Sequence, residues 1–382
     1  MLELVPTAMV AGGDAIARDG DGRVVFVDGA LPRERVLVEL TDDHSRHAKA
    51  RVVEVLEASP ERVLPPCPEV ARGCGACGWQ HIDLDAQRGF KAGIVREALV
   101  RLGRVDPPAL RETVALEPWT FRTTVRAAVV HGRAGFRRAH SHDSLAVDAC
   151  LVAHPRLAEL LIDGRFPGAE EVVLRCGART GERLAVTTPR RAGREVPDDV
   201  RDDHVHEHAA GRSWRVSAAS FFQSRPDGVD ALAALVADAA GEMASPTTAL
   251  DLYSGVGIFA GVLAERGWSV TALEGGRAAH ADARANLRKL GVHVARADVT
   301  TATLTAADLV VADPSRTGLG RAGVATIATS APQRIVLVSC DAANLGRDAG
   351  LLRDAGYRLT SVTPVDLFPH TPHVEVVTVY DR

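Results

Sequence analysis

The sequence predicts an α/β protein whose C-terminal part is a doubly wound parallel sheet and whose N-terminal part is a small antiparallel β-barrel. From about residue 216, buried strand-like runs alternate with helix-like segments, the pattern that builds a parallel sheet covered on both faces. Residues 1–58 consist of short β-branched runs separated by Asp-Gly turns, which is typical of a small barrel. A mixed α+β region lies between them, so we expect three parts, 1–58, 59–210 and 211–382.

The composition is that of an ordinary globular protein, with 382 residues, 46% hydrophobic and 25% charged. No apolar run reaches membrane-crossing length, and the N-terminus lacks the basic start and apolar stretch of a signal peptide. We therefore expect a cytoplasmic protein without a membrane partner, and we infer no obligate protein partner. The net charge of −4 gives no global nucleic-acid signature, so any such contact needs a local basic patch.

Three segments between the barrel and the sheet have clear local signals. The proline-rich "SPERVLPPCPEV" predicts a linker, and "QRGFKAGIVREALVRLGRV" predicts an amphipathic helix. The acidic, histidine-rich "VPDDVRDDHVHEHAAG" predicts a solvated surface loop.

Cysteines cluster in the central part of the chain. Cys67, Cys74 and Cys77 form a C-x6-C-x2-C spacing in "CPEVARGCGACGWQH". In a reducing compartment such a cluster indicates a metal site, and a fourth thiol would complete a four-thiolate shell. Zinc sites usually contain two close pairs, so the spacing favours a 4Fe–4S cluster over zinc. On spacing alone, either Cys150 or Cys176 can be the fourth ligand.

A cofactor turn follows the first strand of the alternating region, in "ALDLYSGVGIFA". Its glycines allow a ligand to approach the backbone, which suits a nicotinamide cofactor as well as S-adenosylmethionine (SAM). The third glycine of the dinucleotide fingerprint is missing, and Asp251 precedes the turn where it would repel a pyrophosphate. Acids also end the later strands, and together these four carboxylates favour SAM: Asp251, Glu274, Asp298 and Asp313.

Three C-terminal segments resemble the signatures of the SAM-dependent RNA 5-methyluridine methyltransferases: "VVADPSRTGLG", "VLVSCDAANLGRD" and "VDLFPHTPHVEVVTVYDR". "SAASFFQSR" resembles the Phe-Phe-Gln motif of that family, and residues 1–58 resemble its TRAM barrel. "CGACGWQH" and "GFRRAHSHDSLAVDAC" resemble the segments around its iron–sulfur ligands. The similarity extends over nearly the whole chain in the family's order.

The resemblance implies a Rossmann-like class I methyltransferase domain and a role for each matched residue. Cys340 would add to uracil C6 as the nucleophile, and Glu375 would remove the C5 proton. The implied SAM site comprises Gln223, Tyr253, Glu274, Asp298 and Asp313. The implied cluster ligands are Cys67, Cys74, Cys77 and Cys150, so the resemblance selects Cys150 over Cys176.

The chain departs from the family pattern at four places. Asp341-Ala342 replaces the usual Asn-Pro after the nucleophile, and Arg225 stands where asparagine is common. Ile258 replaces a small polar residue, and Arg33 replaces a glycine of the barrel. None of these changes removes a catalytic group.

The expected substrate is RNA, with 23S rRNA favoured and tRNA as the other possibility, because the simpler tRNA enzymes usually lack the barrel and the cluster. A basic and aromatic segment is a candidate phosphate-contacting surface, with an ordinary arginine-rich strand pair as the alternative: Phe121, Arg122, Arg126, Arg133, Phe136, Arg137 and Arg138. The competing function is a catalytically inactive RNA-binding protein with a structural or redox-sensing cluster. A nicotinamide oxidoreductase ranks third.

Overall fold

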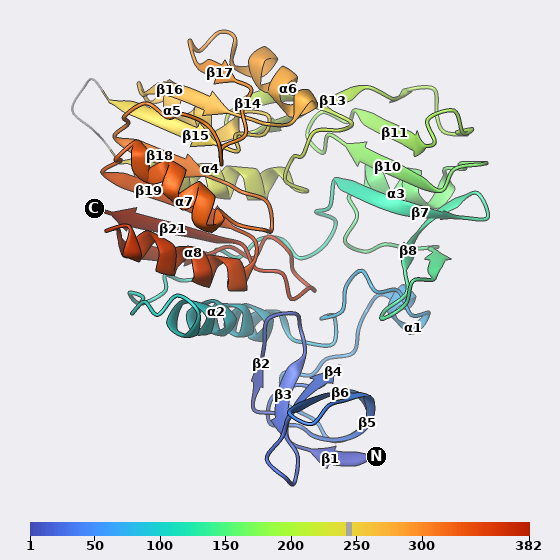
Figure 1. The fold of residues 1–382 in the computed structure, drawn as a ribbon. Coiled ribbons are helices and arrows are strands. Elements are labelled where there is room, and N and C mark those ends of the chain that lie inside the picture. The colour runs from blue at the N-terminus through green and yellow to red at the C-terminus, as the bar shows by residue number, and fades with distance from the viewer. Residues whose placement is uncertain (242–246) are drawn as a thin grey trace.

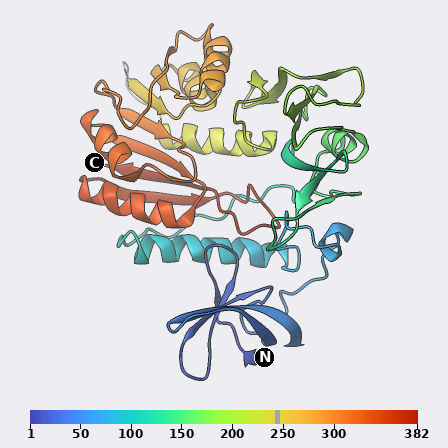
Figure 2. The ribbon, with the colours of Figure 1, turned by 45° about the vertical axis from the view of Figure 1, so that its right-hand side comes forward.

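The computed structural model describes residues 1–241 and 247–382, which Figure 1 shows as three groups. The N-terminal strands lie at the bottom of the view, beneath the long helix α2 (Leu84–Arg101). The central residues form a sheet at the right, and the C-terminal residues form a larger sheet at the left. Figure 2 shows the same separation after a 45° turn.

The N-terminal group is a single twisted sheet with the strand order β1-β5-β6-β4-β3-β2. Its strands are β1 (Leu2–Leu4), β2 (Ala8–Met9), β3 (Ala15–Arg18), β4 (Val24–Asp28), β5 (Arg35–Asp43) and β6 (His47–Glu57). Val25 and Val27 alternate with more exposed residues along β4, as a strand with one covered face requires. The small β-unit was predicted, but the expectation of fully antiparallel pairing is wrong for β4 and β6, which run parallel because β6 inserts between β5 and β4.

Arg33, which replaces a glycine of the family pattern, has a φ of 69°. That left-handed conformation favours glycine, so Arg33 adopts a backbone conformation that glycine adopts more easily.

The central group is a sheet with the order β12-β11-β10-β7-β8-β9 and a separate hairpin β13-β14. Its elements are α1 (Pro68–Ala71), β7 (Thr124–Val130), β8 (Arg133–Arg137), β9 (Ser144–Ala146), α3 (Pro155–Asp163), β10 (Glu171–Cys176), β11 (Arg183–Thr188), β12 (Val200–Arg201), β13 (His204–Ala209) and β14 (Arg212–Ser217). Helix α3 packs on this sheet through Leu157, Leu160 and Leu161.

The prediction of a solvated loop in the histidine-rich segment is wrong, because half of its 16 residues form β12 and β13. Alternate residues of β13 point inward, among them Val205 and Glu207. The Glu207 carboxylate accepts hydrogen bonds from the backbone N–H groups of Ala178, Arg179 and His208. These bonds explain how a charged residue is tolerated in a covered strand.

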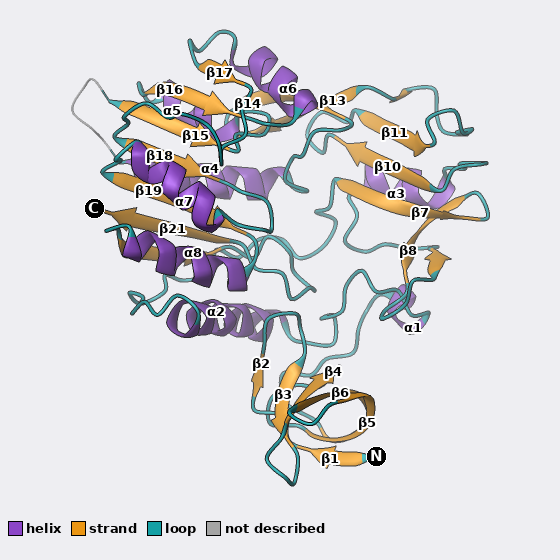
Figure 3. Cartoon of the chain, viewed as in Figure 1, coloured by secondary structure: helices purple, strands orange, loops and turns teal. Residues whose placement is uncertain are grey.

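The C-terminal group is a sheet with the order β17-β16-β15-β18-β19-β21-β20, in which strands and helices alternate (Figure 3). Its elements are α4 (Pro226–Ala240), β15 (Thr248–Leu252), α5 (Ile258–Glu265), β16 (Ser269–Leu273), α6 (Arg277–Leu287), β17 (His293–Ala295), β18 (Leu309–Ala312), α7 (Gly320–Thr329), β19 (Arg334–Ser339), α8 (Ala342–Asp354), β20 (Arg358–Pro364) and β21 (Val376–Asp381). The five strands β15, β16, β17, β18 and β19 are parallel, whereas β21 runs antiparallel to both β19 and β20. The doubly wound sheet is therefore confirmed, with an antiparallel strand inserted near one edge.

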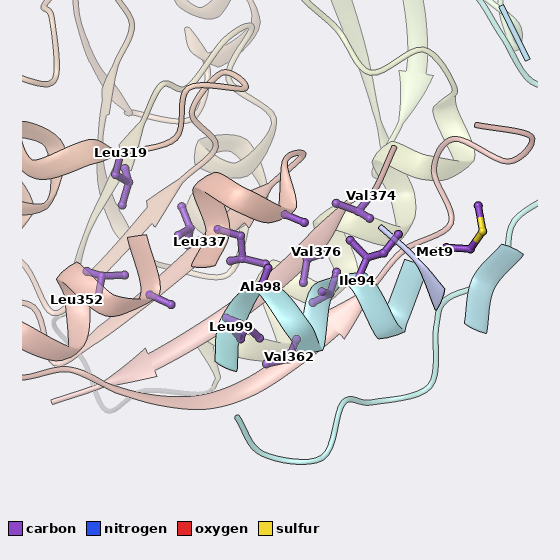
Figure 4. Close-up of a cluster of buried hydrophobic side chains, with 14 of the residues drawn as sticks. Met9, Ile94, Ala98, Leu99, Leu319, Leu337, Leu352, Val362, Val374 and Val376 are labelled. Carbon is purple, nitrogen blue, oxygen red and sulfur yellow. The ribbon is translucent and has the colours of Figure 1, made fainter. Parts of the chain in front are cut away.

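Two apolar cores cover the two faces of this sheet. On one face α4, α5 and α6 pack with Trp214 of β14. On the other face α7 and α8 pack together with α2, as Figure 4 shows for Ala98 and Leu99 near Val362 and Val376. Helix α2 therefore belongs spatially to the C-terminal sheet, although it precedes the central strands in the chain. No helix within 1–241 or 247–382 is long and apolar enough to cross a membrane.

Candidate active site and cysteine cluster

A cavity of about 1070 Å³ opens at the carboxyl ends of β15, β16, β18 and β19. Open α/β sheets bind ligands at this edge, beside the point where the strand order reverses. Six of the predicted site residues line the cavity: Gln223, Tyr253, Glu274, Asp313, Cys340 and Glu375. The arrangement brings together residues that lie up to 152 positions apart in the chain, counted from Gln223 to Glu375.

The glycine turn after β15 forms one wall of this cavity. Tyr253 and Gly257 both have positive φ, of 60° and 97°. A Cβ on Gly257 would lie 2.6 Å from Leu287 Cδ1, so a side chain here would displace Leu287 and strain a backbone that favours glycine. The turn itself lines the cavity through Tyr253, Ser254, Gly255 and Val256.

Glu274 follows β16 and holds the turn in place. Its Oε2 accepts the Gly255 N–H at 2.8 Å, and its Oε1 accepts the Gly276 N–H at 2.6 Å. The carboxylate is therefore fixed at the cavity wall with lone pairs free for a ligand's hydroxyl groups.

Asp313 follows β18 and faces the same cavity, next to Gln223. Burial raises the pKa of Asp313 to about 7, and the Gln223 side chain opposes this rise by hydrogen bonding. A carboxyl group with such a pKa changes charge within the physiological range.

Cys340 and Glu375 are brought together by strand register. Ser339 pairs with Val376 at the end of the antiparallel β19–β21 ladder, and the next residue on each strand is Cys340 or Glu375. Glu375 is only 2% exposed, and its Oε1 has no hydrogen-bond partner among the described residues. Glu375 is therefore a buried carboxylate directly before β21.

The electrostatics of this corner keep protons on both groups. Burial, followed by the charges of Glu375 and Asp313, raises the pKa of the half-buried Cys340 thiol to about 12. Burial and the charge of Asp313 raise the pKa of Glu375 well above its ordinary value. A cation entering the cavity would oppose both effects.

Asp341, one of the departures from the family pattern, is the N-cap of α8. Its side chain accepts the Asn344 N–H at 2.8 Å, and helix α8 begins at the next residue, Ala342. Aspartate is a favoured N-cap residue, so the Asp-Ala pair starts the helix directly after Cys340.

The other departures also have clear positions. Ile258 is the first residue of α5 and lines the cavity. Arg225 is wholly buried, donates to Asp227 at 2.5 Å, and lies 4.4 Å from the centre of the Phe121 ring.

Two of the four predicted carboxylates do not line the cavity. Asp251 lies inside β15, wholly buried, and its Oδ2 accepts the Ala260 N–H of α5 at 2.8 Å. The interpretation that Asp251 faces the cofactor is therefore wrong, because its position in the strand points it under the helix. Asp298 is exposed and accepts hydrogen bonds from Thr300 outside the cavity lining.

The cavity also contains residues that sequence reasoning did not single out. Arg316 lines it, with a guanidinium nitrogen 3.4 Å from His373 Nε2, and Phe221 lines it with 68% of its surface exposed. The available signal for Arg316 was its place three residues after a strand-end aspartate.

The four predicted cluster cysteines line one small hollow of about 20 Å³: Cys67, Cys74, Cys77 and Cys150. Apolar side chains, including Phe136 and Val152, form much of its remaining wall. Cys176 is not part of this lining and lies 3.7 Å from His154 Nδ1. The fold therefore selects Cys150 over Cys176 as the thiol that meets the other three.

The four thiols surround a hollow of about 20 Å³. In the part of the chain that is described, no group of three or more His, Cys, Asp or Glu side chains is placed so that it could hold a metal ion. Burial raises the pKa of Cys77 to about 11, and the Arg122 guanidinium opposes this rise. The buried Arg122 Nε–H has no partner among the described residues, so it could donate to a bound sulfur atom.

The predicted basic and aromatic surface is only partly present. β7 and β8 form the strand pair, but Phe121 is buried and Phe136 packs into the core around the cysteines. Arg126 and Arg133 pair with Glu171 and Asp148. The two aromatic side chains are therefore covered rather than exposed beside the arginines, and the phosphate-contacting role of the arginines stays a prediction.

Comparison with known proteins identifies similar chains. The family model of the TRAM domain matches residues 11–53. A protein of Streptomyces avermitilis, described as an uncharacterized RNA methyltransferase, is 36% identical over 100% of this chain and 97% of its own length. The 23S rRNA (uracil(1939)-C(5))-methyltransferase RlmD of Chromohalobacter salexigens is 33% identical over 97% of this chain and 87% of its own.

A solved structure has a similar fold over the whole chain. The Pyrococcus abyssi tRNA (uracil-54, C5)-methyltransferase in complex with S-adenosyl-L-homocysteine has a TM-score of 0.75 and 22% sequence identity. The match covers 99% of each chain, so the arrangement of all three groups of elements is shared.

Proposed function

Because this chain belongs to the SAM-dependent RNA uracil-C5 methyltransferases, we propose that it methylates C5 of a uridine in 23S rRNA through a covalent adduct of Cys340. The observation that carries the proposal is the meeting of Cys340 and Glu375 in the large cavity at the strand ends. An RNA-binding protein without catalysis does not account for a buried carboxylate next to that thiol.

The proposed chemistry begins with the Cys340 thiolate. Its sulfur bonds to uracil C6, and the C5–C6 π electrons move toward O4, which makes C5 nucleophilic. Bound SAM supplies an electrophilic methyl group on a sulfonium. After C5 has taken that methyl group, Glu375 accepts the C5 proton, the double bond re-forms and the Cys340 thiolate leaves.

The environment of Glu375 supports a role as the base. A buried carboxylate with a raised pKa is a stronger proton acceptor than a solvated one. Burial and the nearby Asp313 both raise that pKa, so the two carboxylates are suited to different tasks in one cavity.

The proposed SAM site follows the lining of the cavity. Glu274 would accept the ribose hydroxyls, and the turn containing Tyr253 would contact the cofactor through its backbone. Asp313 and Gln223 would face the methionine part. Asp298 does not line the cavity. Its proposed role is therefore a contact with the adenine amino group at the edge of the cavity.

We also propose that Cys67, Cys74, Cys77 and Cys150 hold a 4Fe–4S cluster. Four thiols around one hollow and the unpaired Arg122 Nε–H support this assignment. Bound there, the cluster would link α1 and the loop before α3, so its proposed role is to stabilise the central group.

The substrate uridine must leave its stack to reach Cys340, so a loop or a disrupted helix is the expected target. The TRAM sheet offers a second surface for a single strand. The preference for 23S rRNA over tRNA rests on the relative from Chromohalobacter salexigens, whose sequence aligns over 97% of this chain and 87% of its own length.

The test uses unmodified transcripts of 23S rRNA and of tRNA with tritiated SAM. We expect 5-methyluridine in 23S rRNA and none after Cys340→Ser. RNA containing 5-fluorouridine has no C5 proton to remove, so it should trap a protein–RNA adduct that survives denaturation. A trapped adduct in the Cys340→Ser variant would refute the assignment of the nucleophile.

A further inference from the structure

A second hollow, of about 430 Å³, lies between helix α6 and the edge strand β17, which Figure 1 shows side by side at the top of the large sheet. Four of its lining residues carry basic side chains: His280, Arg284, Arg288 and His293. His280, Arg284 and Arg288 are spaced four residues apart, so they share one face of α6 and its C-terminal extension. This hollow does not belong to the large cavity or to the cysteine cluster.

The lining of this hollow contains no acidic residue. Within residues 275–297, Asp282 is the single carboxylate. It is wholly buried and accepts hydrogen bonds from Ser217, Ser220 and Arg215 on the other side of the helix.

The arginines of the hollow differ from Arg126 of β7 and Arg133 of β8, which pair with Glu171 and Asp148. Among the described residues, neither Arg284 nor Arg288 forms an ion pair, although both are exposed. In a chain with a net charge of −4, exposed guanidinium groups left without carboxylate partners favour an anionic ligand.

Helix α6 connects this hollow to the large cavity. Its first turn lines the cavity through Arg277 and Ala278, and its later turns line the hollow through Arg284. The helix has 11 residues, so it is roughly 16 Å long, at about 1.5 Å per residue. The start of α6 lies beside Glu274, so an RNA strand that leaves the cavity on this side and follows the helix would bring a phosphate to the hollow.

We propose that the hollow formed by α6 and β17 is a phosphate subsite for the RNA strand that flanks the target uridine. The inference rests on the proposed function, because it takes the cavity as the place of the uridine. Arginine presents a planar fork of N–H donors that matches phosphate oxygens, and histidine adds further donors at the rim. The subsite would contribute affinity and strand direction, without touching the reacting atoms.

The test compares two charge-neutralised variants of the full-length protein. The first is Arg284→Gln with Arg288→Gln in the hollow. The matched control is Arg111→Gln with Arg358→Gln, two exposed arginines near β20 at the opposite edge of the sheet. RNA binding is measured with an unmodified 23S rRNA transcript at several salt concentrations, and SAM affinity and thermal unfolding are measured in parallel.

We expect the hollow variant to bind this RNA roughly tenfold more weakly and its salt dependence to fall by about one phosphate contact or more. The control variant should bind as the unchanged protein does, and SAM affinity should be equal in all three. Equal RNA affinity and equal salt dependence for the two variants would overturn the inference.

The outcome is separable from that of the proposed function. If the unchanged protein forms 5-methyluridine and the hollow variant still binds RNA normally, only the subsite fails. If the unchanged protein forms no 5-methyluridine, the proposed function fails, and the RNA affinities still report on the hollow.

Discussion

Cys340 and Glu375 directly follow the last pair, Ser339 with Val376, of two antiparallel strands. The register of β19 and β21 therefore determines how close the thiol and the carboxylate lie. The pairings among β15 to β19 are all parallel, so they bring carboxyl ends together. The antiparallel pairing of β19 with β21 instead brings the carboxyl end of β19 to the amino end of β21.

Glu375→Gln should stop the reaction after methyl transfer. The amide cannot accept the C5 proton, so the Cys340 thiolate cannot be expelled and turnover should fall by roughly 10²- to 10⁴-fold. We expect a denaturation-resistant protein–RNA complex with ordinary RNA and SAM, detected by gel electrophoresis. The double change with Cys340→Ala should remove the complex. A Glu375→Gln variant with normal turnover would assign the base to another residue.

The thiol of Cys340 should be unreactive in the protein without cofactor. Burial and the charges of Glu375 and Asp313 raise its pKa to about 12, and only the thiolate reacts with iodoacetamide. The alkylation rate should therefore stay low at pH 8 and still be rising above pH 9. SAM adds a positive sulfonium and should shift this profile to lower pH, whereas S-adenosylhomocysteine, which lacks the charge, should not. Peptide mass spectrometry reads Cys340 separately, and a midpoint below about 8.5 without cofactor would contradict the prediction.

The sequence predicted which strand ends form the cavity, but it did not predict which nearby side chains are buried, for a physical reason. Strand-end positions such as Glu274 and Asp313 are visible in the chain, because a parallel sheet places all carboxyl ends at one edge. The burial of Glu375 depends on the insertion of β21 between β19 and β20, a long-range pairing without a local signal. Asp251 was wrongly placed beside the cofactor, because the apolar sequence of β15 does not indicate which of its side chains point under helix α5.

The same limit explains the errors in the central group. The alternation of β7 and β8 was visible, but which of their two faces becomes covered depends on α3 and on the cysteine hollow. Phe136 therefore points inward although it stands between arginines in the sequence. The grouping of Cys150 with Cys74 likewise depends on the fold of the 75 residues between them (75–149).

Gly257→Ala should damage the cofactor turn more than Gly255→Ala. Gly257 has a φ of 97°, and its added Cβ would lie 2.6 Å from Leu287 Cδ1. Gly255 has a φ of 55° and no atom within 4 Å of its added Cβ. We expect Gly257→Ala to lower the free energy of unfolding by about 1–3 kcal/mol and to weaken SAM binding, with a smaller loss of stability for Gly255→Ala. Thermal unfolding and calorimetric titration measure both, and equal stability losses would contradict the steric argument.

Asp251 should make the stability of the protein depend on pH. Burial raises its pKa to about 8, so the folded protein holds this proton more tightly than the unfolded chain does. The resulting stabilisation is complete below about pH 4, the ordinary value, and is lost as the pH rises through about 8.

Asp251→Asn should flatten that part of the stability profile, because an amide does not titrate. The amide oxygen can still accept the Ala260 N–H, so the local hydrogen bond is kept. We expect the difference between the variant and the unchanged protein to grow by on the order of a few kcal/mol between pH 4 and 8 in denaturant unfolding. Asp21→Asn, at an exposed turn, is the control and should follow the unchanged protein. Parallel profiles for Asp251→Asn would show that the carboxyl is ionised when buried.

Cys150→Ser should remove the iron of the proposed cluster, whereas Cys176→Ser should leave it in place. Cys150 lines the hollow with the three clustered cysteines, whereas Cys176 is 2% exposed and lies beside His154. Anaerobically purified Cys150→Ser should lose most of its iron and sulfide, together with the visible absorption of the cluster, and should unfold at lower temperature. Cys176→Ser should retain both metal and colour, because its side chain lies outside the ligand shell. Full iron content in Cys150→Ser combined with loss in Cys176→Ser would reverse the assignment of the fourth ligand. Zinc in place of iron in the anaerobically purified, unchanged protein would instead refute the cluster.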